Sequence, residues 1–240
     1  MSSVEISERQ GDEQGFVIQD SIEGRTIAFS TSEPVEPRVT ADDDFLFPTD
    51  RTARIETDSI RLDTMVSVFV RTPSGEMVDR VRSHQHRELA AGTYHLEIGA
   101  TVKVYFRIEG PASIDAGADH LDITFDDLST VAVGARSYHQ HPAAVIETTT
   151  DPHDLMAGIG ALSSSLKTTR PEMSYPTLRG HPPLLDIGDE LRIPDELEPK
   201  DTGITIEVPP QPRMIYPVAS LAYYLGADIQ PGEPPRITTD

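Results

Sequence analysis

The segment LAAGTYHLEI (residues 89–98) decides the fold class expected for this chain. Its tyrosine and aliphatic residues alternate with polar ones, as on a strand that buries one face. Residues 102–108 (VKVYFRI) continue the alternation directly afterwards. This pair of segments is typical of the late strands of a β-sandwich domain.

The residues on either side extend the same pattern. Residues 66–70 alternate, and Thr72-Pro73-Ser74-Gly75 predicts a type I turn with a bulge before a returning strand at 77–81. With no helical periodicity between them, the strands predict a mainly β fold, with an antiparallel β-sandwich or jelly-roll-like domain over residues 15–140. Residues 1–14 are polar and are expected to be disordered. Further strands are expected at 16–19, 26–30, 45–47, 53–62, 113–114, 121–125 and 130–133.

Residues 141–240 have a different character and predict a smaller α/β portion. Asp151-Pro152 is a helix start, and the order strand 202–208, helix 215–225, strand 227–230 is that of a parallel βαβ unit. Short strands are also expected at 184–187 and 190–193. Two interpretations stay open: the start of a larger domain that continues beyond residue 240, or a compact appendage to the sandwich.

The charge balance points to a protein that works in high salt. Forty acidic residues face twenty basic ones, of which only Lys103, Lys167 and Lys200 are lysines, and the net charge is −20. At molar salt the Debye length falls to about 3 Å, so the repulsion between these carboxylates largely vanishes. Residues 1–150 hold 26 acids and residues 151–240 hold 14, so the acid belongs to the whole surface rather than to a tail.

Composition also excludes several classes of protein. No dense basic patch is available for nucleic acid, and the absence of cysteine removes disulfides, thiolate metal sites and cysteine nucleophiles. No apolar run approaches 18 residues, and no secretory signal is recognisable. A soluble, cytoplasmic protein that binds neither nucleic acid nor membrane is therefore expected.

Histidines are the main candidates for chemistry. His139 and His141 flank one residue, which places both rings on one face of a strand, and His153 and His181 lie downstream. With a carboxylate, such a set can hold zinc or another divalent metal. The segment His84-Gln85-His86 repeats the same spacing, which weakens the argument for either pair.

Other catalytic motifs are missing from the sequence. The serines 163–165 lie in a predicted helix without a nucleophile elbow, and Gly158-x-Gly160 lacks the lysine of a phosphate loop. Acid clusters at 42–44 and 126–127 are the expected background of this composition. We therefore predict no catalytic residue.

Two aromatic segments are candidates for contact with a partner. Residues 174–183 (SYPTLRGHPP) are a stiff loop that presents Tyr175 and Arg179, and residues 213–226 (RMIYPVASLAYYLG) carry Tyr216 and Tyr223. In these two segments, YPTLRGHPP and YPVASLAYYLGAD, the chain resembles a group of long uncharacterised intracellular proteins of halophilic archaea. The resemblance covers mainly residues 140–240. It implies a large multidomain protein of which this chain is the N-terminal part, and no assigned activity.

These observations lead to three functional hypotheses. The first is a non-enzymatic interaction or scaffold module that binds a protein partner or forms a homo-oligomer. The second is a metal-assisted hydrolase or ligand-binding domain that uses the histidines. The third is a regulatory region of an enzyme whose catalytic domain lies beyond residue 240.

Overall fold

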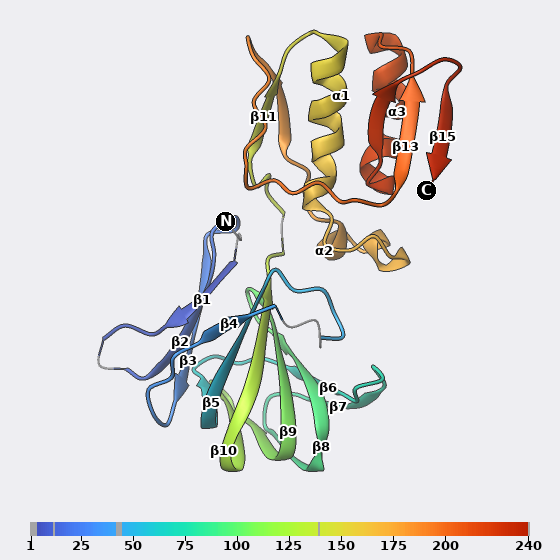
Figure 1. Ribbon diagram of the computed structural model, residues 1–240. Helices are drawn as coiled ribbons and strands as arrows, with labels where there is room; N and C mark the ends of the chain where they lie inside the picture. Colours follow the sequence, from blue (N-terminus) through green and yellow to red (C-terminus); the bar gives the residue numbers. More distant parts are fainter. Residues whose placement is uncertain (1–3, 12, 42–44, 139, 240) are drawn as a thin grey trace. The chain divides into compact units, whose positions relative to one another are not determined.

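A computed structural model describes residues 4–11, 13–41, 45–138 and 140–239 (Figure 1). The chain divides into two compact units, Ser2–Tyr138 and His139–Asp240. Strands make up most of its regular structure and the helices belong to the second unit, which confirms the expected mainly β class. None of the helices in the described part has the length and apolar content that crossing a membrane requires.

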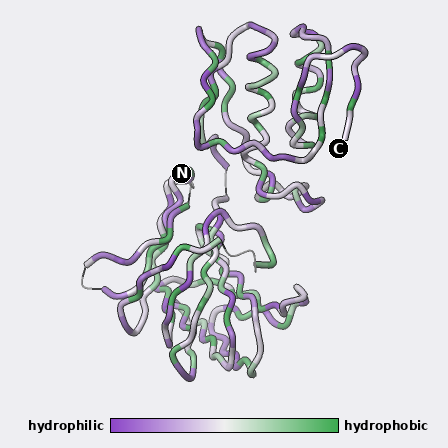
Figure 2. The backbone as a smooth tube through the Cα atoms, viewed as in Figure 1, coloured by the Kyte–Doolittle hydropathy of each residue, from purple (hydrophilic) through white to green (hydrophobic). Residues whose placement is uncertain are grey.

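The first unit contains one large antiparallel sheet. Its strands follow the order β1-β2-β3-β5-β10-β9-β8-β6-β7, and β4 pairs with β5. Hydrophobic and hydrophilic residues follow each other along these strands (Figure 2), as in a sheet with one buried face. The strands are β1 (Val4–Glu8), β2 (Gly15–Asp20), β3 (Arg25–Thr31), β4 (Arg38–Thr40), β5 (Arg51–Leu62), β6 (Val68–Arg71), β7 (Met77–Val81), β8 (Gln85–Gly99), β9 (Lys103–Ala116) and β10 (Leu121–Arg136).

This sheet curls around a single core. The rings of Phe29 on β3 and Phe106 on β9 have centroids 5.4 Å apart, and Phe16 on β2 lies 6.3 Å from Phe106. In a flat sheet β3 and β9 would be about 14 Å apart, because three strand spacings separate them. All three phenylalanines are fully buried. The curl therefore gathers side chains from both ends of the sheet into one hydrophobic cluster.

Irregularities in the long strands accompany this curvature. The pairing of β8 with β9 shifts register between Leu89 and Gly92. The pairing of β10 with β9 shifts between Phe125 and Ala132. Such bulges bend a strand and increase its twist. At the first of them, a side chain at Gly110 would bring its Cβ within 2.9 Å of the Ala90 carbonyl oxygen, so the close approach of β8 and β9 requires glycine there.

Two expectations for the first unit were wrong. The segment 1–14 is not devoid of structure, because Val4–Glu8 forms β1 and pairs with β2. Residues 45–47 do not form a strand: the Phe45 ring meets His95 edge-on at 6.5 Å, and Phe47 stacks on Tyr105 at 5.5 Å. The apolar side chains of this loop are covered by the sheet face opposite the core, and no strand pairing is needed to bury them.

The predicted turn between β6 and β7 is confirmed. The Gly75 amide donates to the Thr72 carbonyl at 2.9 Å, and Gly75 has a φ of 88°. This left-handed conformation is one that glycine adopts without steric cost. The turn thus has the geometry that Thr72-Pro73-Ser74-Gly75 indicates.

Over residues 140–239 the second unit has two small sheets and three α-helices. In the first sheet β11 and β12 are parallel, and in the second β13 is parallel to β14 and antiparallel to β15. The strand–helix–strand order predicted for 202–230 is confirmed. Residues 190–193 form no strand and contribute only an isolated bridge from Arg192 to Glu147. The elements are β11 (Val145–Thr148), α1 (Pro152–Gly160), 3₁₀ helices Ala161–Ser165 and Pro171–Ser174, α2 (Pro176–Arg179), β12 (Leu184–Ile187), β13 (Ile204–Val208), α3 (Pro212–Leu225), β14 (Asp228–Pro231) and β15 (Arg236–Thr239).

The two long helices of this unit begin and end where the sequence indicates. Asp151 caps α1 by accepting a hydrogen bond from the His153 amide at 2.8 Å. Gly226 ends α3 in the left-handed conformation, with φ of 61°. A second core lies between α1, α3 and the sheet of β13 and β14; its buried members are Leu155, Met156, Ile159, Ile206, Val208, Ile215, Ala222, Ala227 and Ile229.

Candidate interaction site

The histidines predicted as metal ligands do not form a metal centre in the described part of the chain. His139 lies outside the described residues. His153 is exposed in the first turn of α1, and the His181 ring nitrogen Nδ1 lies 2.9 Å from the Pro182 carbonyl oxygen. Across residues 4–11, 13–41, 45–138 and 140–239, no three His, Asp or Glu side chains converge as metal ligands, His141 included. The described side chains therefore do not support the predicted site for zinc or another divalent ion.

The other His-x-His segment contains a histidine bound by carboxylates. His86 on β8 faces Asp115 on β9, with its Nδ1 3.3 Å from the carboxylate and its Nε2 2.7 Å from Glu88. The hydrogen bond with Glu88, supported by Asp115, raises the pKa of His86 above its ordinary value. This side chain is half exposed and belongs to a surface charge cluster.

An NMR titration of the His86 ring protons is expected to give a midpoint above about 6.5, and Glu88→Gln should move it down. Because the folded state binds the proton more tightly, this contribution to stability is fully present below the unfolded pKa. It is lost as pH rises through the raised pKa. An unshifted wild-type midpoint, or a midpoint indifferent to Glu88→Gln, contradicts the assignment.

Tyr223, one of the four predicted interaction residues, serves packing inside the unit. Its hydroxyl lies 3.4 Å from the Arg179 carbonyl oxygen and 3.3 Å from that of Gly180, and Ser165 donates to it from 3.4 Å. Burial raises the pKa of this phenol. Tyr223 therefore attaches the loop that follows α2 to helix α3, and its hydroxyl is not presented to a partner.

The other three predicted interaction residues lie at the surface or near it. The Arg179 guanidinium stands over the Tyr224 ring, 5.4 Å from its centroid, in a cation–π contact. Tyr175 and Tyr216 are exposed. The structure thus brings Arg179 and Tyr223 together, and the Arg179 amide also donates to the Tyr175 carbonyl at 3.1 Å within the turn of α2.

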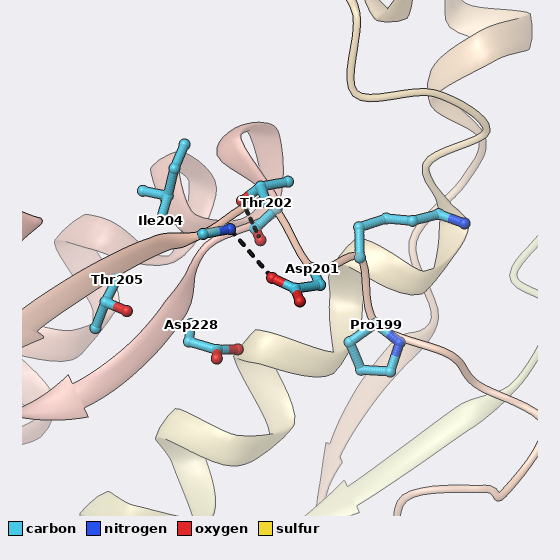
Figure 3. Close-up of a pocket in the computed structure, with 9 residues that line it drawn as sticks. Pro199, Asp201, Thr202, Ile204, Thr205 and Asp228 are labelled. Atoms are coloured by element: carbon cyan, nitrogen blue, oxygen red, sulfur yellow. Dashed lines mark hydrogen bonds between the residues drawn. The ribbon is translucent and has the colours of Figure 1, made fainter. Parts of the chain in front are cut away.

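A hollow of about 230 Å³ opens where β13 and β14 begin (Figure 3). The carboxylates of Asp201 and Asp228 border it. Asp201 already accepts a hydrogen bond from the Gly203 amide at 3.1 Å, and Thr202 donates to the carbonyls that end α3. Ligands of parallel α/β sheets bind at the carboxyl ends of the strands, whereas this hollow lies at the amino ends. The hollow forms where the loop of residues 199–203 is hydrogen-bonded to the C-terminal end of α3.

The carboxyl end of β13 is also poorly suited to phosphate. A phosphate site there would use free amides at the start of α3. Pro209, Pro210 and Pro212 have no N–H to offer. The amides of Met214 and Ile215 already donate to the Gln211 carbonyl. The sequence and these hydrogen bonds therefore favour no nucleotide at this βαβ unit.

An uncovered sheet is the clearest candidate site of the second unit. The side chains of Val145 and Leu184, neighbours in register, are 51% and 52% exposed, and Ile187 is 56% exposed. Leu185 points toward α1, since its Cδ1 would lie 2.9 Å from a Cβ at Gly158. Parallel strands are normally covered on both faces. Here helix α1 lies beside one face, and the aliphatic pair on the other is open to solvent.

The outer edge of β12 is free in the described part of the chain. The amides of Leu184 and Gly188 donate hydrogen bonds to the carbonyls of Ala144 and Thr148 on the β11 side. The N–H and C=O groups of Leu185 and Ile187 therefore point away from β11. The Ile187 amide donates a hydrogen bond to the Asp186 carboxylate at 2.9 Å. Sequence reasoning missed this surface because the aliphatic run LLDI predicts a strand but not what covers it.

Comparison with known proteins finds no matching family model and no similar curated protein or solved structure.

Proposed function

We propose that the chain is a non-enzymatic interaction module that self-associates through β12. The observation that supports this most directly is the β12 edge, which has no strand partner in the described parts of the chain and lies beside exposed aliphatic side chains. Exposed apolar edges of this kind pair readily with another strand. In the same proposal the curled sheet of the first unit is a sandwich-like scaffold, and the protein works in the cytoplasm of a salt-adapted cell.

A second copy of the chain fits this edge in one favoured register. Two β12 strands related by a twofold axis run antiparallel, and their outward residues must face each other. An axis at Leu185 pairs Leu185 with itself and places Asp186 opposite Leu184. An axis at Asp186 would oppose two carboxylates, which is destabilising. The Leu185 register is therefore the one we propose, and it extends the two strands to a four-stranded sheet.

The charge of the chain makes this association dependent on salt. Each copy carries a net charge of −20, and Asp189 and Glu190 follow β12 after Gly188. Two such copies repel each other at low ionic strength, and screening at molar salt removes most of that repulsion. The apolar contact itself strengthens as salt rises. Dimerisation should therefore increase with KCl concentration.

Sedimentation velocity tests the proposal with a single substitution. Leu184→Asp places a second carboxylate opposite Asp186 of the other copy, and we expect the dissociation constant to rise at least about tenfold. In molar KCl, the mass obtained from sedimentation of the wild-type protein should be twice that of one chain. Leu128→Asp is the matched control, because Leu128 is exposed in the first unit, far from β12 in sequence. A monomeric wild type, or equal dimerisation of Leu184→Asp, contradicts the proposal.

A further inference from the structure

Helix α3 exposes a face that carries almost no charge. Its buried stripe contains Ile215 and Ala222, which are 0% and 1% exposed. The opposite stripe of the helix, at intervals of three or four residues, consists of exposed side chains. We call this stripe, together with the exposed side chains beside it, the α3 face. Its members are Arg213, Tyr216, Pro217, Ser220, Leu221 and Tyr224.

The composition of the α3 face differs from that of the rest of the chain. An amphipathic helix normally carries charged residues opposite its buried stripe, and a quarter of the residues in this chain are charged. Helix α3 has one charged residue in fourteen, Arg213. Tyr216, Leu221 and Tyr224 are 53%, 42% and 46% exposed. Aromatic residues and arginine are enriched at protein interfaces, and acidic residues are depleted there, so this face has the composition of a contact surface.

A guanidinium lies at each end of the α3 face. Arg213 belongs to the first turn of the helix, where its Nε donates to the Gln211 side-chain oxygen at 2.9 Å. At the other end the Arg179 guanidinium stands over the Tyr224 ring, 5.4 Å from its centroid. Within the described parts of the chain neither arginine forms an ion pair, and residues 208–227 contain no Asp or Glu. Both guanidinium groups can therefore accept carboxylates from outside the chain.

The spacing of these two charges defines the partner. Arg213 and Tyr224 are eleven residues apart, which is about 17 Å along a helix and three nearly complete turns around it. Two carboxylates eleven residues apart on a second helix have the same separation and also share one face. Side chains four and seven residues after the first carboxylate lie on that face between them. Helices pack side by side with their axes about 8–10 Å apart, so one helix can make all these contacts.

We propose that the α3 face binds an amphipathic helix of a partner protein that carries two carboxylates eleven residues apart on its apolar face. The carboxylates meet Arg213 and Arg179, whose planar donors match their oxygens. Aliphatic side chains between the carboxylates lie against Tyr216, Pro217 and Leu221. This partner differs from the second copy of the chain proposed for β12, and the two surfaces share no residue.

Fluorescence anisotropy with two labelled helical peptides tests the α3 face. The first peptide has two glutamates eleven residues apart, leucines four and seven residues after the first glutamate, and only alanine and glutamine elsewhere. The second has glutamine in place of both glutamates. At the lowest KCl concentration at which circular dichroism shows folded protein, the glutamate peptide should bind at least about tenfold more tightly. This difference should shrink as more KCl screens the charges.

The Arg213→Gln variant shows whether the carboxylates meet the predicted residue. It should weaken binding of the glutamate peptide about tenfold and leave the glutamine peptide unchanged, because the lost contact involves a carboxylate. The matched control is Arg236→Gln, which changes the net charge equally. Arg236 pairs with Glu207 at 2.8 Å, and Glu207 lies between the buried Ile206 and Val208, so this pair is on the sheet face opposite the helices.

Three results would overturn the inference: equal binding of the two peptides, no binding of either, or equal losses for Arg213→Gln and Arg236→Gln. The Leu184→Asp variant should bind both peptides as the wild type does, which separates this result from self-association through β12. Should Arg213→Gln not fold, an NMR titration of the wild type with the glutamate peptide decides. Amide shifts centred on residues 212–225 support the inference, and shifts centred elsewhere overturn it.

Discussion

Replacing Phe106 by alanine is expected to lower the free energy of unfolding by about 3–5 kcal/mol. Phe106 is fully buried and contacts Phe29 and Phe16, which come from the other end of the sheet. Its removal leaves a cavity at the point where the curled sheet closes on itself. Urea denaturation followed by far-UV circular dichroism measures the loss, since most strands belong to the first unit.

Phe69→Ala is the control for that experiment. Phe69 is also a strand phenylalanine, but it is partly exposed on β6, where Arg80 stands 4.7 Å from its ring centroid. We expect a loss of about 1 kcal/mol there, from a cation–π contact and partial burial. Similar losses for both variants would mean that the sheet is not closed around the phenylalanine cluster.

The thermal midpoint of the chain is expected to rise by about 10–20 °C between 0.1 and 3 M KCl, as several kcal/mol of repulsion is screened. Below about 0.5 M we expect the protein to unfold or lose its fixed tertiary packing. The described ion pairs, such as Arg61 with Asp122 at 3.0 Å, are largely exposed and offset few of the forty acids. Differential scanning calorimetry over a KCl series measures the shift.

Sucrose serves as the control for this salt effect. It strengthens burial by exclusion from the surface but screens no charge, so it should restore much less stability than KCl at low ionic strength. Equal midpoints at 0.1 and 3 M KCl would overturn the interpretation of the composition as salt adaptation. The test matters for self-association too, because dimerisation through β12 has to be measured where the chain is folded.

Local signals predicted the regular elements well. The alternation at 89–98 and 102–108 became β8 and β9, the Thr72–Gly75 turn has its expected geometry, and Asp151 and Gly226 cap their helices. These features depend on residues a few positions apart, where propensity and hydrogen bonding act directly. The βαβ order at 202–230 followed from the same signals.

Candidate sites were predicted less well than elements. The histidine set at 139–181 was suggested by spacing, but three metal ligands have to converge in space, and spacing along the chain does not ensure that. Tyr223 was a candidate for contact with a partner in a helix whose tyrosines were expected to pack it against the sheet, and its hydroxyl lies among the Arg179, Gly180 and Ser165 groups. Whether an aromatic side chain faces inward depends on how helix α3 packs.

By itself the sequence determined the acidic, cysteine-free surface, the strand-rich first part and the βαβ order of the second. Only the tertiary structure decided that residues 45–47 cover the sheet instead of joining it, that Phe106 meets Phe29, and that the outer edge of β12 has no strand partner among the described residues. The register line of the first sheet is an example, since Arg38, Arg54, His95 and Arg107 lie on it although they are far apart in the chain. Strand register joins them, and register is set by the packing of the whole sheet rather than by any local segment.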